Sequence, residues 1–237
     1  MNMQELKNIY GRIQACHVCP NMDKQKMLRR TDAVDCVMDI FIISQALAET
    51  TLRKTGVNFF GSQGLPGNTG KLLEEFLNLF SFTIYPPVEI ALNDGAVIRA
   101  RSPHLRSIYN TEITQCYPGK AKNGKGDRIP SGREVLSCSE RKFLELEISL
   151  IKPKLVLLMG RHARDNFYKQ YLHLKYPTKL NDHIEVIVSE GKLPCATVGG
   201  HTFYVCPIMH ASGQNPYFRT MLRNTDLVSL IIKAITS

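Results

Sequence analysis

The chain lacks the features that mark membrane and secreted proteins. No apolar run is long enough to span a bilayer. The first residues, Met-Asn-Met-Gln-Glu-Leu-Lys, are polar and mixed in charge, unlike a secretory signal peptide. Internal repeats and low-complexity linkers are also absent. We therefore expect a cytoplasmic protein with no membrane partner, and its 237 residues predict one domain.

A disulfide framework is missing too, because seven cysteines is an odd count and the cytoplasm keeps thiols reduced. Cys16 and Cys19 form a tight pair, whereas Cys116 and Cys138 are distant single residues. This pattern predicts a metal or iron–sulfur site that ties an N-terminal arm to the folded body. The alternative is four unrelated thiols, because three further cysteines show that the chain uses this residue freely.

Acidic residues are scarce relative to basic ones. The 21 Asp and Glu residues against 30 Lys and Arg residues leave a net charge of +9. Such an excess favours a polyanionic partner, most often nucleic acid, although an inert basic surface is the alternative. Basic residues cluster at 29–30, 99–106 and 120–133. The last cluster lies between Cys116 and Cys138, so we expect the metal site and a phosphate-binding surface to be neighbours.

Apolar patterns along the chain predict strands alternating with helices. Strands are predicted at 39–44, 108–115, 153–160, 184–188 and 202–209. Helices are predicted at 3–15, 69–80, 133–151, 161–171 and 226–235, the last capped by Thr225 or Asp226. A hairpin is expected at 86–101 with its turn at 93–95, and a Gly/Lys loop at 118–130.

This order predicts an α/β fold with three α/β/α layers and a central, mostly parallel sheet. In such folds, ligands bind outside the carboxyl ends of the strands. Three polar segments are expected there, at 44–49, 112–116 and 210–215.

Six sequence pieces, in this order, resemble the uracil-DNA glycosylase superfamily, particularly its iron–sulfur-containing family 4 and family 5 branches. The pieces are the pair Cys16 and Cys19; Ser44-Gln-Ala-Leu-Ala-Glu; Gly56-Val-Asn-Phe-Phe-Gly with Lys71-Leu-Leu; Thr114-Gln-Cys-Tyr-Pro-Gly with Cys138; Ile151-Lys-Pro-Lys-Leu-Val-Leu-Leu-Met-Gly-Arg; and His210-Ala-Ser-Gly-Gln-Asn. The resemblance covers most of the chain and implies a single domain over 1–237 with an insertion around 83–107.

The resemblance also implies a structural 4Fe–4S cluster held by Cys16, Cys19, Cys116 and Cys138, with zinc as the alternative metal. It implies an enzyme that hydrolyses the bond between a base and its deoxyribose. Such an enzyme must flip the nucleotide out of single- or double-stranded DNA into a pocket. No protein partner is implied, and we expect a monomer.

Site residues follow from the same resemblance. His210 would donate a hydrogen bond to the pyrimidine O2, although a core or surface histidine is the alternative. Phe59 would stack on the flipped base, with a plain core aromatic as the alternative. The other substrate-binding candidates are Glu112, Ala46 and Ser212, and the DNA-binding candidates are Gln214, Asn215, Tyr217, Arg219, Lys120 and Lys122.

Two departures from the family pattern bear on the chemistry. Family 4 enzymes have Gly-Glu-Ala-Pro-Gly in the first motif, whereas Gln45 replaces the carboxylate here. Glu49 or backbone groups are the candidates for holding the attacking water. The family also has Asn four positions before the third cysteine, where this chain has Glu112.

An ionised carboxylate at position 112 only accepts hydrogen bonds, so it would repel uracil O4 and suit an amino group at C4. A protonated Glu112 could still serve uracil. We therefore favour a modified cytosine over uracil. Glycosylases that remove glucosylated hydroxymethylcytosine from phage DNA offer an example, and on that reading the protein would act in anti-phage defence.

Two other classes of function remain open. One is a non-catalytic DNA- or damaged-base-binding module that has kept the fold and the cluster, which the loss of the first-motif carboxylate supports. The other is a zinc-dependent nucleic-acid factor of unrelated fold.

Overall fold

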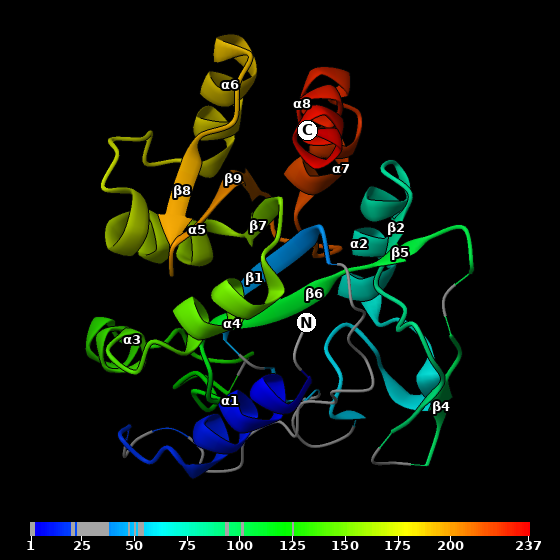
Figure 1. Ribbon diagram of the computed structural model, residues 1–237, viewed down its shortest axis with the longest axis vertical. Coiled ribbons are helices and arrows are strands. Elements are labelled where there is room, and N and C mark those ends of the chain that lie inside the picture. The colour runs from blue at the N-terminus through cyan, green and yellow to red at the C-terminus, as the bar shows by residue number, and fades with distance from the viewer. Residues whose placement is uncertain are drawn as a thin grey trace.

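A computed structural model describes residues 3–19, 22, 38–46, 48–49, 51, 55–92, 95–100, 102–124 and 126–237. Arg29, Arg30, Cys36, Asn93 and Asp94 lie outside the described residues. Five strands form a central sheet in the order β6-β1-β7-β9-β8 (Figure 1). Their bounds are β1 Ile40–Ala46, β6 Tyr109–Thr114, β7 Leu155–Met159, β8 Cys195–Val198 and β9 His201–Ile208.

The four strands β6, β1, β7 and β9 run parallel, and only β8 pairs antiparallel, with β9. Strand β7 is buried along its whole length, as expected of a parallel strand covered on both faces. Ile40 and Ile42 of β1 belong to one hydrophobic cluster, whereas Phe41 and Ile43 belong to the other. The alternation of side chains along the strand therefore supplies two cores, one on each face of the sheet.

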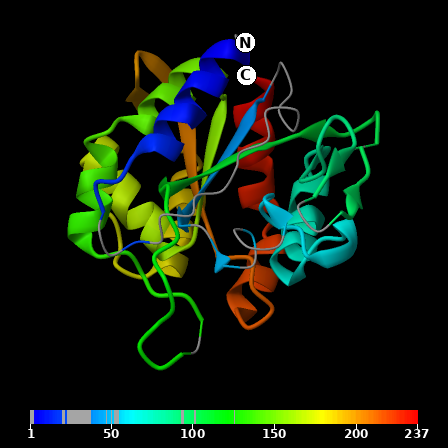
Figure 2. The same ribbon diagram turned by 90° about the horizontal axis from the view of Figure 1, so that it is seen from below.

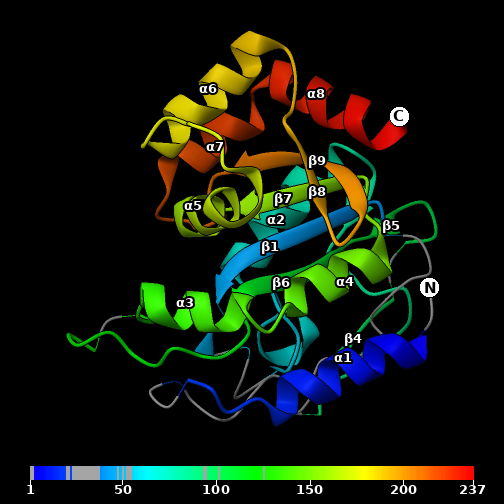
Figure 3. The same cartoon turned by 60° about the vertical axis from the view of Figure 1, so that its left-hand side comes forward.

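Helices cover both faces (Figure 3). One cluster contains buried side chains of α2 Asn68–Asn78, α6 Leu180–Glu190, α7 Pro216–Leu222 and α8 Thr225–Thr236. The other contains those of α1 Met3–Ala15, α3 Gly132–Ser139, α4 Phe143–Ile151 and α5 Arg161–Phe167. The predicted three-layer α/β/α fold is confirmed. No helix in the described part of the chain is long and apolar enough to cross a bilayer.

One predicted strand is wrong, because residues 184–188 lie within helix α6. The buried residues of α6 are Leu180, His183, Ile184 and Ile187, whose spacing is that of one helical face. A short apolar run cannot distinguish a strand from such a face. The fifth strand is β8, which the sequence did not reveal because it is short and alternates buried with exposed residues.

The predicted helix at 133–151 is also wrong in one respect, because it is two helices. Lys142 adopts a left-handed conformation with φ of 57° and separates α3 from α4. Ser131 caps α3 and, with Glu134, forms a capping box. The cap of α8 is Asn224, whose side chain accepts from the Leu227 N–H at 3.0 Å, and not Thr225 or Asp226.

Small strands between α2 and β6 lie to one side of the main sheet (Figure 1). Strand β2 Phe82–Thr83 pairs with β5 Arg106–Ser107, and β3 Ile90–Ala91 pairs with β4 Val97–Ile98. The antiparallel pairing of β3 and β4 confirms the predicted hairpin. Gly64 has φ of +68°, and a Cβ there would lie 2.1 Å from the Val97 carbonyl oxygen. Glycine is therefore required where the Gly-rich loop packs on this hairpin.

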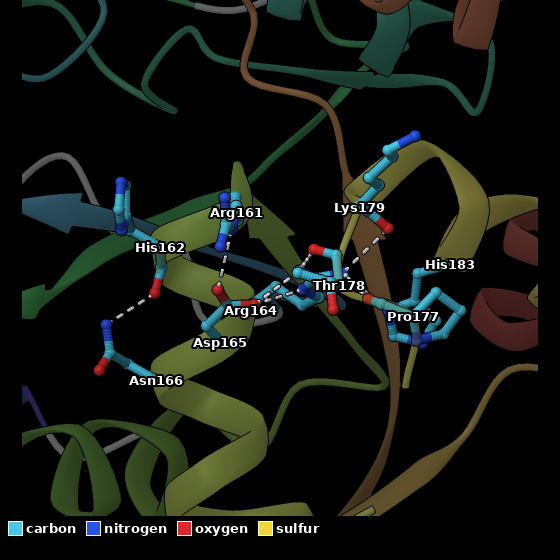
Figure 4. A network of polar contacts seen from close by, with 9 residues as sticks. All are labelled: Arg161, His162, Arg164, Asp165, Asn166, Pro177, Thr178, Lys179 and His183. Carbon is cyan, nitrogen blue, oxygen red and sulfur yellow. Dashed lines mark hydrogen bonds and ion pairs between the residues drawn. The ribbon is translucent and has the colours of Figure 1, made fainter. Parts of the chain in front are cut away.

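Helix α5 is anchored by a buried guanidinium (Figure 4). Arg164 is fully buried and donates to the carbonyl oxygens of Pro177 at 2.9 Å and Thr178 at 2.8 Å. Its Nε also donates to Asp165 at 2.7 Å. These bonds satisfy the buried charge and hold the chain after the π-helical turn Tyr168–Leu172 against α5.

Candidate active site

A cleft of about 680 Å³ lies where β1, β7 and β9 end. Its wall comes from Ser44–Ala46 at the end of β1 and Ala48 beyond it, from Met159 at the end of β7 and 160–162 beyond it, and from His210 after β9. Pro118, Asp127 and Arg128 after β6 also line it, together with Thr51, 58–61 and 67–69. The strand ends therefore meet at one edge, as predicted. The volume lies within the range of small-molecule sites. Figure 2 shows the loop after β6 and α7 reaching the same end of the sheet.

Phe59 lies on the cleft wall in an unusual backbone conformation. Its φ is 71°, which is left-handed and disfavoured for an aromatic residue. The start of α2 holds it there, because the Gly67 N–H donates to the Phe59 carbonyl oxygen at 2.8 Å. A Cβ on Gly70 would lie 2.2 Å from the same oxygen. Helix α2 thus fixes the position of the aromatic ring, and such strained residues concentrate at functional sites.

His210 directly follows β9 and faces the same cleft. Its ring packs on Gly160, where a Cβ would lie 3.4 Å from the His210 Cβ. Protein around the accessible imidazole replaces part of its hydration, and this desolvation lowers the pKa of His210 below the ordinary histidine value. The ring is therefore neutral at pH 7. Asn215 donates to the His210 carbonyl oxygen at 3.2 Å and also caps α7.

The first-motif residues separate into two groups. Gln45 and Ala46 line the cleft at the end of β1. Glu49 does not belong to the cleft wall; it pairs with Lys120 at 2.5 Å, and Lys120 also contacts Asp127 at 3.2 Å. The hydrogen bonds that Lys120 donates to these two carboxylates raise its pKa. The charge of this predicted DNA-binding residue is therefore compensated locally.

Asp127 is a cleft residue that the sequence did not single out. Among the described residues of the cleft wall, it is the only one with a carboxylate. It accepts from the Tyr117 hydroxyl at 3.0 Å and from the Glu49 backbone N–H at 3.3 Å. The only signal was its place in the loop between the third and fourth cysteines.

Arg128 lies beside Asp127 on the wall and is bound to Glu134 at 2.6 Å. The guanidinium lowers the pKa of Glu134 to about 2, so the pair is ionised at neutral pH. Arg161 and His162, in the first turn of α5, complete the wall (Figure 4). These two residues were missed, although they follow a predicted buried strand directly and so occupy the edge where ligands bind.

Glu112 does not line the cleft. It lies on β6 opposite Ser44 and is fully buried. The side-chain amide of Asn58 donates a hydrogen bond to it. Asn58, which the sequence analysis did not single out, does line the cleft and is 8% exposed.

The remaining predicted residues lie in the loop after β6 and in the segment after His210. Gln214, Tyr217, Arg219 and Lys122 are exposed, outside the cleft wall. Ser212 also lies outside this wall, and its hydroxyl accepts from the Gln214 N–H at 3.2 Å. This hydrogen bond stabilises the turn at residues 212–214.

Cys16, Cys19, Cys116 and Cys138 line one small cavity of about 20 Å³. Burial raises the pKa of the Cys138 thiol to about 12, while the Gln115 N–H, 3.5 Å from its sulfur, acts in the opposite direction. Within the described ranges, no three His, Cys, Asp or Glu side chains are already arranged as ligands of one ion. The donor set itself, four cysteines that line one cavity, is of the kind that iron–sulfur clusters and structural zinc ions use.

The other cysteines differ in their environments. Cys206 is fully buried in β9, whereas Cys195 is exposed in β8.

The uracil DNA glycosylase superfamily matches residues 32–234. Comparison with curated proteins found no match.

Gly70→Ala is expected to destabilise the chain by about 1–3 kcal/mol, because the new Cβ would overlap the Phe59 carbonyl oxygen and force α2 away from it. Gly67→Ala is the matched control. A Cβ at Gly67 would lie 3.7 Å from the same oxygen, an ordinary contact. Urea unfolding measures both variants, and equal losses of stability would contradict this account of how α2 holds Phe59.

Proposed function

Because the chain belongs to the uracil DNA glycosylase superfamily, we propose that it hydrolyses the N-glycosidic bond of a pyrimidine nucleotide flipped out of DNA. Members of this superfamily are DNA glycosylases that act on DNA. The observation that carries the proposal is one cleft, at the carboxyl ends of the strands, whose wall includes both His210 and Phe59.

In the proposed reaction, the flipped base stacks on the ring of Phe59, which compensates part of the stacking lost in DNA. The C1′–N1 bond breaks and its electron pair leaves with the base, so negative charge develops on O2. The His210 imidazole donates a hydrogen bond to that oxygen. Its lowered pKa keeps the ring neutral, so it donates one N–H without carrying a charge of its own.

A water oxygen then adds to C1′ and its proton must be accepted. Gln45 lines the cleft but its amide is not a base. We assign this task to Asp127, the carboxylate of the described wall. The bonds from Tyr117 and from the Glu49 backbone hold its carboxylate in place. Lys120 pairs with both Asp127 and Glu49, but Glu49 lies outside the cleft wall.

Within the pyrimidines, we propose a modified cytosine as the substrate, with uracil as the alternative. Support comes from the size of the cleft, about 680 Å³, which leaves room for a modified base. The net charge of +9 supports binding to the phosphate backbone. The exposed side chains of Gln214, Tyr217, Arg219 and Lys122 are candidates for contacting it. Removal of a modified base from phage DNA is the biological role we favour.

His210→Ala should lower the rate of base release by about 100-fold or more, because a donor to the developing charge is lost. DNA affinity should change by less than about threefold. The assay uses duplexes containing uracil, cytosine, hydroxymethylcytosine or glucosylated hydroxymethylcytosine, followed by alkaline cleavage of abasic sites. His104→Ala, at an exposed position away from the cleft, is the control. The enzymatic proposal fails if the unaltered protein releases no base from any duplex.

Asp127→Asn should reduce the rate at saturating DNA by about 10- to 100-fold, because the amide cannot accept the proton of the attacking water. Glu49→Gln should have a much smaller effect, since that side chain lies outside the cleft wall. Asp226→Asn, in the exposed first turn of α8, makes the same chemical change elsewhere. A larger loss from Glu49→Gln than from Asp127→Asn would transfer the role to Glu49.

A non-catalytic DNA-binding module is the second candidate function. The observation that favours it is the amide of Gln45 where related enzymes carry a carboxylate. Tight DNA binding without base release from any of the four duplexes would support it.

We also propose that Cys16, Cys19, Cys116 and Cys138 hold a 4Fe–4S cluster, with zinc as the alternative. When bound, the cluster would supply a structural crosslink between the segment after α1, the end of β6 and helix α3. The four cysteines come from these three parts of the chain. The loop carrying Asp127 begins at the same place, so the crosslink would support one side of the cleft.

The purified protein should be brown and contain about four iron atoms per chain. Cys138→Ser should lose most of the iron and lower the melting temperature by at least about 5 °C, because metal binding contributes to folding. The exposed Cys195→Ser should change neither quantity. A colourless protein containing about one zinc ion per chain would identify the alternative metal.

A further inference from the structure

A buried carboxylate lies behind the wall of the cleft. Glu112 has no exposed surface, although its strand neighbour Ser44 lines the cleft. One residue of the cleft wall contacts this carboxylate directly. That residue is Asn58, which lines the cleft and is hydrogen-bonded to Glu112. The contact links positions 54 residues apart in the chain.

The pair restricts how the Asn58 amide is oriented. The Nδ2 atom of Asn58 donates to Oε1 of Glu112, so the amide directs its donor side toward Glu112. The amide is planar, so Oδ1 lies away from the Nδ2–H that Glu112 holds. In the described part of the chain, this is the only hydrogen bond of the Asn58 side chain. The Oδ1 atom is thus left to accept from a ligand in the cleft.

The backbone around Asn58 is also held. The buried hydroxyl of Thr55 donates to the Val57 carbonyl oxygen at 2.9 Å and accepts from the Val57 N–H at 3.3 Å. Phe59 follows directly in its left-handed conformation. Adjacent residues therefore present an aromatic face and a fixed amide to one cleft. A base stacked on Phe59 would bring its edge toward Asn58.

We infer that Asn58 reads the edge of the base and that Glu112 is a positioning residue that orients its amide. This inference rests on the function proposed above and identifies the substrate as a pyrimidine with an amino group at C4. That amino group donates to Oδ1 of Asn58, whereas the C4 oxygen of a uracil-type base would oppose another acceptor. Glu112 acts on the substrate through Asn58.

Hydroxymethylcytosine and hydroxymethyluracil provide a matched test, because they differ at C4 and share the C5 group. In the unaltered protein, base release should favour hydroxymethylcytosine by roughly tenfold or more. Glu112→Gln should reduce this preference to within about threefold, because a neutral amide can donate or accept and no longer fixes the orientation of Asn58. Asn58→Ala should also remove the preference.

Glu147→Gln is the matched control. Glu147 is another fully buried carboxylate, which accepts from Tyr109 at 2.7 Å and Thr111 at 2.8 Å. This variant should keep the preference even if its melting temperature falls. If Glu112→Gln does not fold, the inference is tested by whether Asn58→Ala still prefers hydroxymethylcytosine over hydroxymethyluracil. A preference that persists in a folded Glu112→Gln or Asn58→Ala protein overturns the inference, as does an unaltered protein that favours hydroxymethyluracil.

Binding separates this inference from the proposed function. Duplex affinities are measured in a His210→Ala protein, with and without Glu112→Gln, for the same two bases. If no base is ever released but the affinity ratio is at least about tenfold and collapses with Glu112→Gln, the glycosylase proposal fails and the assignment of Asn58 stands. If bases are released, but Glu112→Gln changes neither the preference in base release nor the affinity ratio between the two bases, only the assignment of Asn58 fails.

Discussion

The parallel hydrogen bonding of β1 with both β6 and β7 is the constraint on which the rest of the site depends. Parallel pairing brings the carboxyl ends of neighbouring strands to one edge. The chain leaves each strand there, so the segments after β1, β6, β7 and β9 converge. Both faces of the sheet must be covered for this pairing to be stable, which explains why apolar side chains point to both sides of β1. Two cores thus maintain one cleft.

Much of this framework could be predicted from the sequence. Continuous apolar runs identified β1 and β7 because strands buried on both faces need no polar alternation. The rule for strand ends then located the cleft and His210. Residues 184–188 were misassigned because four or five apolar residues satisfy both a strand and one face of a helix. The break between α3 and α4 at Lys142 could not be predicted from the sequence, because lysine does not by itself favour a left-handed backbone.

Contacts between residues that are distant in the chain could not be predicted from the sequence. Glu112 was expected to face the base, but local patterns cannot show that Asn58 lies in front of it. Lys120 was expected to bind DNA, yet Glu49 and Asp127 approach it from other segments and compensate its charge. A net charge of +9 therefore does not identify which cations are available to phosphate. Pairing in three dimensions decides that.

The guanidinium of Arg164 has a consequence for how the site could adapt. Arg161 and His162 lie one helical turn or less before it, and Arg164 is tied to backbone carbonyl oxygens that do not depend on side-chain identity. Lysine could not reproduce this planar set of donors. The part of the cleft wall that comes from α5 is consequently held in a fixed position. Divergence toward bases of different bulk would have to arise elsewhere on the wall, for example at Gly61 and Gly67, where an added Cβ would meet only ordinary contacts of 3.8 and 3.7 Å.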